Sequence, residues 1–232
     1  MIDHRPFDSL GRFETDWLKA RHHFSFGGYH DPARMGWGSL RVWNDDAIRA
    51  GTGFPPHPHA DMEIITYVRD GAISHRDSLG HDGRTIAGDV QVMSAGNGIR
   101  HSEYNLEEDT TRIFQIWIIP DRPGGAPRWD TMSFPKGDRS GQFVTLASGN
   151  PDRDGGLMIR ADARVVGATL KAGETVTYET APDRHLYLVP ASGQVTVDGR
   201  TIAARDGLAL TGVDTVTITA EVDTEIVMTD TR

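Results

Sequence analysis

Imidazole and carboxyl side chains occupy every second position from residue 57 to residue 63: His57, His59, Asp61 and Glu63. Residues two apart share one face of a β-strand, so a regular strand would present all four groups together and continue into the apolar Ile65. A face that is polar at one end and apolar further along fits the interior of a β-barrel. We therefore expect this strand to begin at a barrel mouth, where the flanking prolines restrict edge pairing.

A second polar group with strand spacing follows in the segment NGIRHSEYN, where His101 and Glu103 share one face. If the fold brings the two groups together, His57, His59 and His101 supply three imidazoles beside a carboxylate. That mixed nitrogen and oxygen set suits divalent Fe, Mn, Ni, Cu or Zn. An isolated histidine is usually an ordinary hydrogen-bonded residue, but buried unpaired histidines are destabilising and ligation resolves this. Matched groups on separate strands therefore predict a metal site.

Short runs of alternating or β-branched residues, broken by Gly, Pro and Asp, make up most of the chain. This pattern predicts an all-β fold of the sandwich or barrel type. Two stretches, 18–24 and 45–51, are each predicted to hold a turn or two of helix. The runs expected to form strands are SLRVWN (39–44), EIITYV (63–68), DVQVMS (89–94), RIFQIWII (112–119), QFVTLAS (142–148), GATLKA (167–172), HLYLVP (185–190), QVTVDG (194–199), TVTITA (215–220) and EIVMTD (225–230).

An internal repeat divides the chain in two. The hexapeptide DGRTIA begins at Asp82 and again at Asp198, half a chain length later. The hydrophobic runs before and after each copy also correspond, so we infer two similar β domains in tandem. The joint is expected in the turn-rich, charged segment 128–141, which gives an N-terminal metal-binding domain, 1–135, and a C-terminal domain, 136–232.

Composition excludes several classes of function. The 232 residues include no cysteine, which rules out disulfides, thiolate metal sites, iron–sulfur clusters and thiol catalysis. Lys and Arg number 24 against 33 Asp and Glu, a net charge of −9 that argues against direct nucleic-acid binding through phosphates. We see no secretion signal and no apolar segment that would span a membrane. A soluble cytoplasmic protein is expected.

The two polar groups also match known motifs. His57, His59 and Glu63 are spaced as in the first cupin motif, and residues 88–105 as in the second. The resemblance is dense over residues 17–135. It implies an all-β fold of two tandem cupin-type barrels with a few short helices. More closely, four segments resemble the pirin family of two-cupin proteins: HHFSFGGYHDP, HPHADMEIITYVRDG, HRDSLG and GDVQVMSAGNGIRHSE.

The pirin resemblance implies one divalent transition metal in the N-terminal cupin, usually Fe(II), with Mn, Ni, Cu, Co or Zn as alternatives. Carried over position by position, the ligands would be His57, His59, His101 and Glu103. In cupins generally the first-motif glutamate is a ligand, which here is Glu63, and strand parity permits either carboxylate. The sequence HSE is distinctive of pirins and favours Glu103. Glu63 would then hydrogen-bond a ligand imidazole or a water, or be structural only.

Other polar residues are candidates for the surroundings of the site. Gln115 and Trp117 share one predicted strand and could line a pocket, although core packing is the first expectation for Trp117. His75 and His81 belong to the hairpin between the two polar groups and are expected to be exposed. Asp61 is expected at the rim. Three further histidines in the Gly-rich segment would either cover the cavity mouth or order the loop: His22, His23 and His30.

The repeat offers an internal comparison for the metal site. At the repeat spacing, the counterparts of the predicted ligands carry no imidazole, so we expect the C-terminal domain to lack metal ligands and to act as a scaffold or partner surface. The residues at these positions are Thr177, Glu179, Asp183, Thr217 and Thr219.

A site of three histidines and one glutamate in a cupin resembles that of flavonol dioxygenases, and some bacterial pirins are quercetinases. In such enzymes the metal binds the deprotonated flavonol, and a carboxylate accepts the proton of its 3-hydroxyl group. The resemblance therefore implies a metal-dependent dioxygenase that opens a flavonol such as quercetin. Its partners would be a small phenolic substrate and O2, with Glu103, or alternatively Glu63, as the catalytic carboxylate.

A function of another class is compatible with the same ligands. Eukaryotic pirins are associated with transcriptional co-regulation, which implies a non-enzymatic, iron-dependent redox sensor that presents a surface to a protein partner. A metal-stabilised scaffold is a third possibility. Cupins host many functions, so the fold does not separate these alternatives. A cavity of roughly 300–1,000 Å³ beside the metal would favour an enzyme.

Overall fold

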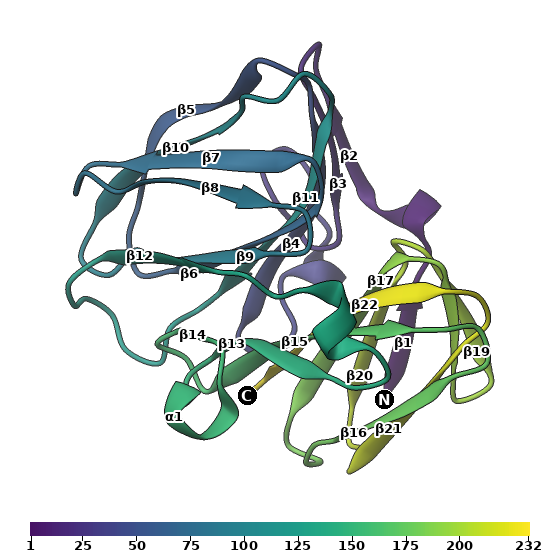
Figure 1. The fold of residues 1–232 in the computed structure, drawn as a ribbon. Helices are drawn as coiled ribbons and strands as arrows, with labels where there is room; N and C mark the ends of the chain where they lie inside the picture. Colours follow the sequence, from purple (N-terminus) through teal and green to yellow (C-terminus); the bar gives the residue numbers. More distant parts are fainter.

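A computed structural model describes residues 1–232 and shows two β-rich halves packed against each other (Figure 1). The N-terminal half contains two antiparallel sheets, of seven and four strands. Its strands are β2 (Gly11–Glu14), β3 (Leu18–His22), β4 (Leu40–Ile48), β5 (Thr52–His59), β6 (Glu63–Asp70), β7 (Ala72–Asp77), β8 (Asp82–Ile86), β9 (Val90–Ser94), β10 (Ile99–Asn105), β11 (Thr111–Ile118) and β12 (Arg128–Met132).

The C-terminal half repeats this architecture with a seven-stranded and a four-stranded sheet. The strand β1 (Ile2–Arg5), at the start of the chain, joins the larger one. The other strands of this half are β13 (Val144–Ser148), β14 (Leu157–Met158), β15 (Ala163–Leu170), β16 (Thr175–Glu179), β17 (His185–Ser192), β18 (Gln194–Val197), β19 (Arg200–Ala203), β20 (Gly207–Thr211), β21 (Thr215–Ala220) and β22 (Thr224–Thr231).

Sheet topology confirms the inferred duplication. The N-terminal orders β9-β6-β11-β4 and β5-β10-β7-β8 correspond strand for strand to β20-β17-β22-β15 and β16-β21-β18-β19. Gly71 and Gly193 end the equivalent strands β6 and β17 with φ of 74° and 77°, and a Cβ on either would meet a threonine, Thr111 or Thr224. The predicted all-β fold of two tandem cupin barrels is therefore confirmed, and all ten predicted runs form strands.

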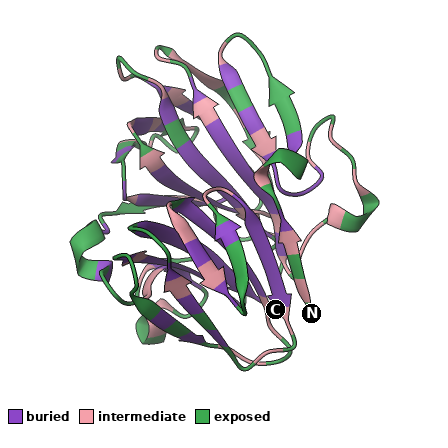
Figure 2. Ribbon diagram, turned by 90° about the vertical axis from the view of Figure 1, so that its right-hand side faces the viewer, coloured by how far each residue is buried: buried purple, intermediate pink, exposed green.

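The halves are joined by a shared core and by strand β1, which comes from the start of the chain but pairs in the C-terminal sheet. The largest hydrophobic cluster contains 23 buried residues from both larger sheets, including Tyr67 and Tyr187. The strand β1 pairs with β20, so the first residues of the chain lie among the C-terminal strands, as the purple arrow beside the green and yellow ones in Figure 1 shows. The joint after residue 135 stays a prediction. In Figure 2 the buried segments run through the middle of the sheets and exposed segments lie at the outside.

Helix is scarcer than the sequence suggests. The helical turns predicted for 18–24 and 45–51 are wrong because residues 18–22 lie in β3 and residues 45–48 lie in the end of β4, and both strands are paired. In β3, Leu18, Ala20 and His22 are buried and alternate with less buried residues, a period of two. No helix of the structure is long and apolar enough to cross a membrane. The helical segments are α1 (Pro151–Asp154) and the 3-10 turns η1 (Phe7–Ser9), η2 (Pro32–Arg34) and η3 (Lys136–Arg139).

The expectation of one regular strand from His57 to Ile65 is also wrong. The chain turns at Asp61, whose φ is 50°, and separates β5 from β6, which belong to different sheets. Ile65 and Tyr67 belong to the core between the halves, whereas Ile64 and Val68 belong to the clusters inside the N-terminal barrel. The alternation expected for one strand therefore does not carry across the turn.

The interiors of the two barrels differ in polarity. The C-terminal barrel is filled by one apolar cluster of 16 residues, whereas the N-terminal barrel has two small apolar clusters, of six and four. Polar side chains occupy the space between those two clusters. The cross-strand row Gln91, Thr66, Gln115 and Asn44 corresponds to the apolar row Leu208, Leu188, Met228 and Val166.

Candidate metal centre

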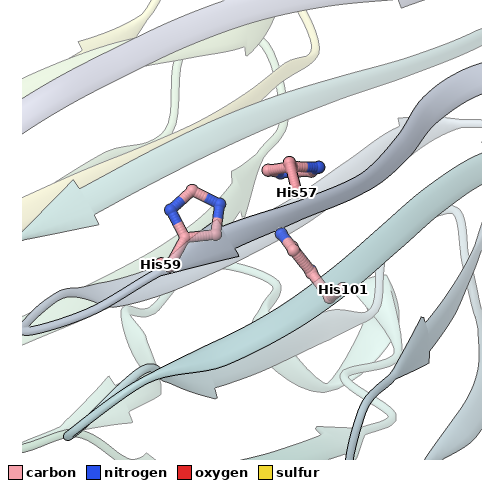
Figure 3. Close-up of side chains that lie close together, drawn as sticks. All are labelled: His57, His59 and His101. Atoms are coloured by element: carbon pink, nitrogen blue, oxygen red, sulfur yellow. The ribbon is translucent and has the colours of Figure 1, made fainter.

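Three histidines converge on two neighbouring strands inside the N-terminal barrel. β5 and β10 pair antiparallel, with His57 opposite His101 and His59 opposite Ile99. The ring centroids of His57 and His101 are 4.5 Å apart, and those of His59 lie 4.8 and 4.9 Å from the other two. One nitrogen of each ring lies within 4.8 Å of the others, and Figure 3 shows the three side chains close together. The structure thus brings together the three histidines predicted to bind metal.

The local sequence positions these strands. β5 is an edge strand of its sheet, and its register against β10 shifts by one residue between His57 and Phe54. The extra residue falls in the Pro55–Pro56 segment, which has no N–H groups to donate to a neighbouring strand. This bulge allows His57 and Phe54 to face residues His101 and Glu103 of β10, as the prolines in the sequence predicted for an edge strand.

Hydrogen bonds determine which nitrogen of His57 is free. Its Nδ1 lies 2.7 Å from the carbonyl oxygen of Pro55, which can only accept a hydrogen bond. The proton therefore resides on Nδ1, and the lone pair on Nε2 is available. His101 presents a free atom as well, because its buried Nε2 has no hydrogen-bond partner in the protein. A ligated metal ion satisfies such atoms, so the histidines fit the ion that the pirin resemblance implies.

His75 lies behind His101 and was predicted wrongly to be exposed. It is 1% exposed, and its ring stacks on Trp129 with centroids 4.9 Å apart. Nδ1 of His75 is 3.4 Å from Nδ1 of His101, and Nε2 is 3.2 Å from Oδ2 of Asp77. That carboxylate also contacts Nδ1 of His81 at 2.8 Å, and the His81 side chain is 40% exposed. A chain of contacts thus leads from the candidate ligand His101 toward the surface.

Glu103, the predicted fourth ligand, is buried in a set of amide and hydroxyl donors. Gln91 donates to Oε1 at 2.7 Å, Thr66 donates to Oε1 at 3.1 Å, and Gln115 donates to Oε2 at 2.7 Å. A carboxylate has about four lone-pair positions, so one position on Oε2 remains. A carboxylate oxygen of Glu103 lies within 4.8 Å of one ring nitrogen of His75 and one of His101. It does not lie this close to all three of His57, His59 and His101.

Electrostatics favour the forms that bind metal. Burial, followed by the charges of neighbouring imidazoles, lowers the pKa of His59 to about 4. The pKa of His101 is also lowered to about 4, chiefly by burial. Burial alone would raise the pKa of Glu103, but the His101 charge and the Gln115 hydrogen bond outweigh it and lower the pKa below its ordinary value. Neutral imidazoles and an ionised carboxylate are the ligand forms that a cation requires.

Glu63, proposed above as a second catalytic carboxylate, does not lie with the histidines. It is 1% exposed and accepts a 2.6 Å hydrogen bond from Ser94 Oγ, its cross-strand neighbour. Strand alternation places Glu63 on the face of β6 opposite Thr66, which contacts Glu103. Asp61, predicted at the rim, forms the turn, where it accepts a hydrogen bond from the Gly124 N–H at 2.5 Å.

A cavity of about 400 Å³ opens beside His57 and His59. Gln115 and Trp117 both line it, and the Trp117 ring meets His59 edge to face at a centroid distance of 5.0 Å. His22 also lines the cavity. The other histidines of the Gly-rich segment do not. His23 is fully buried against Tyr187, and His30 is exposed. The apolar part of the lining comes from Phe13, Leu18, Ala20, Phe26, Phe54 and Trp117.

Several buried polar residues of this region were not identified from the sequence. His75 and Asp77 are two residues apart in the segment HRD (75–77), and a strand would place them on one face. The predicted ligands were identified by the same spacing. Gln91 alternates with buried valines, so a polar side chain at an interior position was detectable. Asn44 and Asp46 gave no such signal because their strand was expected to end and become helical.

The counterparts of Glu103 and His75 in the second half are apolar. Glu103 pairs with His75, and the equivalent pair is Ile218 with Val197. Thr217, predicted from the constant repeat spacing as a counterpart of His101, is exposed on the opposite face of β21. The spacing is not constant because equivalent loops differ in length. The interior side chains of this barrel therefore carry no ligand atoms at these positions.

Comparison with known proteins agrees with this architecture. The pirin family model matches residues 4–118, and the model of the quercetinase C-terminal cupin domain matches residues 145–231. A pirin-like protein of Caulobacter vibrioides is 65% identical over 230 residues, 99% of each chain. A quercetin 2,3-dioxygenase of Escherichia coli is 39% identical over 232 residues, covering 99% of this chain and 98% of that one.

A solved structure extends the similarity to three dimensions. The bacterial pirin YhhW of Escherichia coli, crystallised in complex with nickel(II), superposes with a TM-score of 0.94 at 38% identity. The superposition covers 100% of this chain and 99% of that chain. Motifs, topology and full-length similarity agree, and the chain belongs to the pirin family of two-cupin proteins.

Proposed function

We propose that this chain is a metal-dependent dioxygenase that opens a flavonol such as quercetin. The observation that carries the proposal is the convergence of three imidazoles on the wall of a cavity of about 400 Å³. A cavity of that size accommodates a small organic ligand, which a redox sensor would not need beside its metal. Full-length similarity to the Escherichia coli quercetin 2,3-dioxygenase supports the flavonol as substrate class.

The proposed metal ligands are His57, His59, His101 and Glu103, with Fe(II) as the resident ion. The nickel(II) in the Escherichia coli pirin is consistent with a site that accepts several first-row ions. When bound, such an ion supplies Lewis-acid stabilisation of a flavonolate and redox access to O2.

The residues around the ligands have separate tasks. Gln91, Thr66 and Gln115 fix the Glu103 carboxylate and keep it ionised, since each donates to it. The remaining position on Oε2 limits Glu103 to one further partner at a time, either the metal or the proton of the substrate's 3-hydroxyl group. Trp117 and the aromatic side chains of the cavity orient flat rings and exclude water. Glu63 has no part in this proposal.

The test begins with the metal content of protein purified without added metal. We expect about one first-row ion per chain, a shift in the quercetin spectrum on anaerobic binding, and bleaching when O2 is admitted. His101→Ala should lose both the ion and the bleaching. His30→Ala, which removes an exposed histidine outside the cavity lining, is the matched control and should retain both.

Each failure has a distinct meaning. Protein that contains metal but never bleaches quercetin would contradict the flavonol dioxygenase and favour sensing through the same site. Metal retained at full stoichiometry in His101→Ala would contradict the ligand assignment itself.

A further inference from the structure

The cavity beside the histidines has a second polar wall. His22 of β3 and Asn44 of β4 are cross-strand partners, and Asp46 lies two residues further along the same face of β4. All three side chains line the cavity. Both strands belong to the seven-stranded sheet, whereas His57 and His59 belong to the four-stranded one. The cavity therefore has polar groups on both sheets of the barrel.

Each of these three side chains is buried and holds one polar atom that has no hydrogen-bond partner in the protein. His22, Asn44 and Asp46 are 5%, 4% and 2% exposed. Nδ1 of His22, Oδ1 of Asn44 and Oδ1 of Asp46 have no hydrogen-bond partner. Buried polar groups in folded proteins are almost always paired, and three residues that line one cavity and each hold an unpaired polar atom are rare unless a ligand is bound there.

Asp46 has no ion-pair partner. Its neighbour Asp45 is bonded to Arg69 and Arg205, but Asp46 makes no such pair. Burial, followed by the charges of Asp45 and Glu103, raises the pKa of Asp46 well above its ordinary value. The protonated form that this shift favours both donates and accepts hydrogen bonds, as a partner of a hydroxyl group must.

We propose that Asp46, together with Asn44 and His22, forms a subsite that hydrogen-bonds a ring hydroxyl group of the substrate. The flat remainder of the ligand lies between the aromatic residues of the cavity, and its metal-binding oxygen faces the histidines. The inference rests on the proposed function, and it narrows the substrate class to aromatic compounds that carry hydroxyl groups on more than one ring position. A singly hydroxylated analogue leaves the subsite unpaired and binds less tightly.

A structural role for Asp46 makes an opposite prediction about stability. Asp46→Leu retains branching at Cγ but removes the unpaired buried carboxyl. If the residue serves a ligand, the metal-free variant should melt at the same or a higher temperature than the wild type, because the folded state no longer holds an unsatisfied group. If the residue holds the barrel together, the melting temperature should fall, and that result would overturn the proposal.

Binding provides the second measurement. Nickel(II)-loaded protein would be titrated without oxygen with quercetin and with 3-hydroxyflavone, which shares the metal-binding hydroxyl but lacks the others. We expect the wild type to bind quercetin about tenfold more tightly, the value of one good hydrogen bond. Asp46→Leu should reduce that preference to about twofold or less, whereas Asp46→Asn, which retains hydrogen-bonding capacity, should keep most of it. Nickel content should be unchanged in both variants.

The outcomes separate the subsite from the function. An equal preference for quercetin in the wild type and in Asp46→Leu would overturn the subsite and leave the flavonol dioxygenase standing. Failure of the wild type to bind either compound would overturn the proposed function, and the subsite with it.

Discussion

Nδ1 of His101 and Nδ1 of His75 lie 3.4 Å apart, and the opposite nitrogen of His75 contacts Asp77 at 3.2 Å. A carboxylate only accepts, so Nε2 of His75 carries a proton and, in the neutral ring, Nδ1 is an acceptor. His101 must then donate through Nδ1, which leaves the lone pair of its Nε2 free. Two buried side chains outside the predicted ligand set therefore select the tautomer of a candidate ligand.

Asp77→Asn is predicted to weaken metal binding without removing a ligand. The amide can donate to His75 and reverse the hydrogen-bond direction, which places the proton of His101 on the wrong nitrogen. Losses of about 10- to 100-fold are typical when such supporting partners are removed. Competition of the protein with a chelator of known affinity for nickel(II) measures the effect.

His81→Gln is the matched control for this chain of contacts from His101 through His75 to Asp77. His81 contacts the same carboxylate from the outside but does not touch His75 or His101, so metal affinity should change by less than about threefold. If the His81 and Asp77 variants lose equal amounts of metal affinity, the whole chain of contacts out to His81, rather than the tautomer of His101, determines that affinity.

Glu103→Gln is predicted to weaken metal binding and to abolish oxygen-dependent loss of quercetin. The substitution removes the negative charge. The new NH2 group faces the donor of either Gln91 or Gln115, and that donor loses its acceptor. Metal content after dialysis and single-turnover bleaching of quercetin are the measurements.

The carboxylate on the other face of β6 is the control. Glu63→Gln keeps a side chain that accepts from Ser94 and lies away from the histidines, so metal content should be unchanged. If Glu63→Gln loses the metal and Glu103→Gln keeps it, the general cupin ligand set applies to this chain.

Much of this site was predictable from sequence because its signals are local. His57 with His59, and His101 with Glu103, are two residues apart. Within one strand this spacing places both side chains on the same face, whatever the strand pairs with. The strand face predicted for Glu63 was wrong because the chain turns at Asp61, and a positive φ at a non-glycine residue leaves no mark in the alternation. After that turn, residues with odd numbers no longer lie on the same face as His57 and His59.

The supporting polar residues depend on cross-strand register, which a single sequence does not state. Gln91, Thr66 and Gln115 come from three strands and meet Glu103 only because the strands pair at one level. The helical expectation for residues 45–51 failed for a related reason, because pairing of β4 with strands on both sides overrides local propensity. Because residues 45–51 were expected to be helical, Asp46 was not recognised as a side chain on the interior face of a strand.

Removal of the metal is predicted to lower the melting temperature. A ligand that binds only the folded state stabilises it by about 2.7 kcal/mol at 100 times its dissociation constant. For a chain of this size that corresponds to roughly 5–10 °C. Calorimetry before and after chelation measures the difference, and restored metal should reverse it. His101→Ala should already melt at the lower temperature and respond little to the chelator; an unchanged wild-type temperature would contradict a tightly bound ion.

Acid is predicted to destabilise the protein through His23, away from the metal site. Burial, followed by nearby arginines, lowers the pKa of His23 well below 6.5, and its Nδ1 contacts the Tyr187 hydroxyl at 2.9 Å. Its contribution to stability is complete above pH 6.5 and is lost as pH falls toward the folded-state pKa, because the unfolded chain takes up the proton first. Urea unfolding of metal-free protein between pH 7 and 5 should show a slope shallower in His23→Gln by up to about 1.4 kcal/mol per pH unit. Parallel slopes in the two proteins would mean that His23 gains its proton without unfolding.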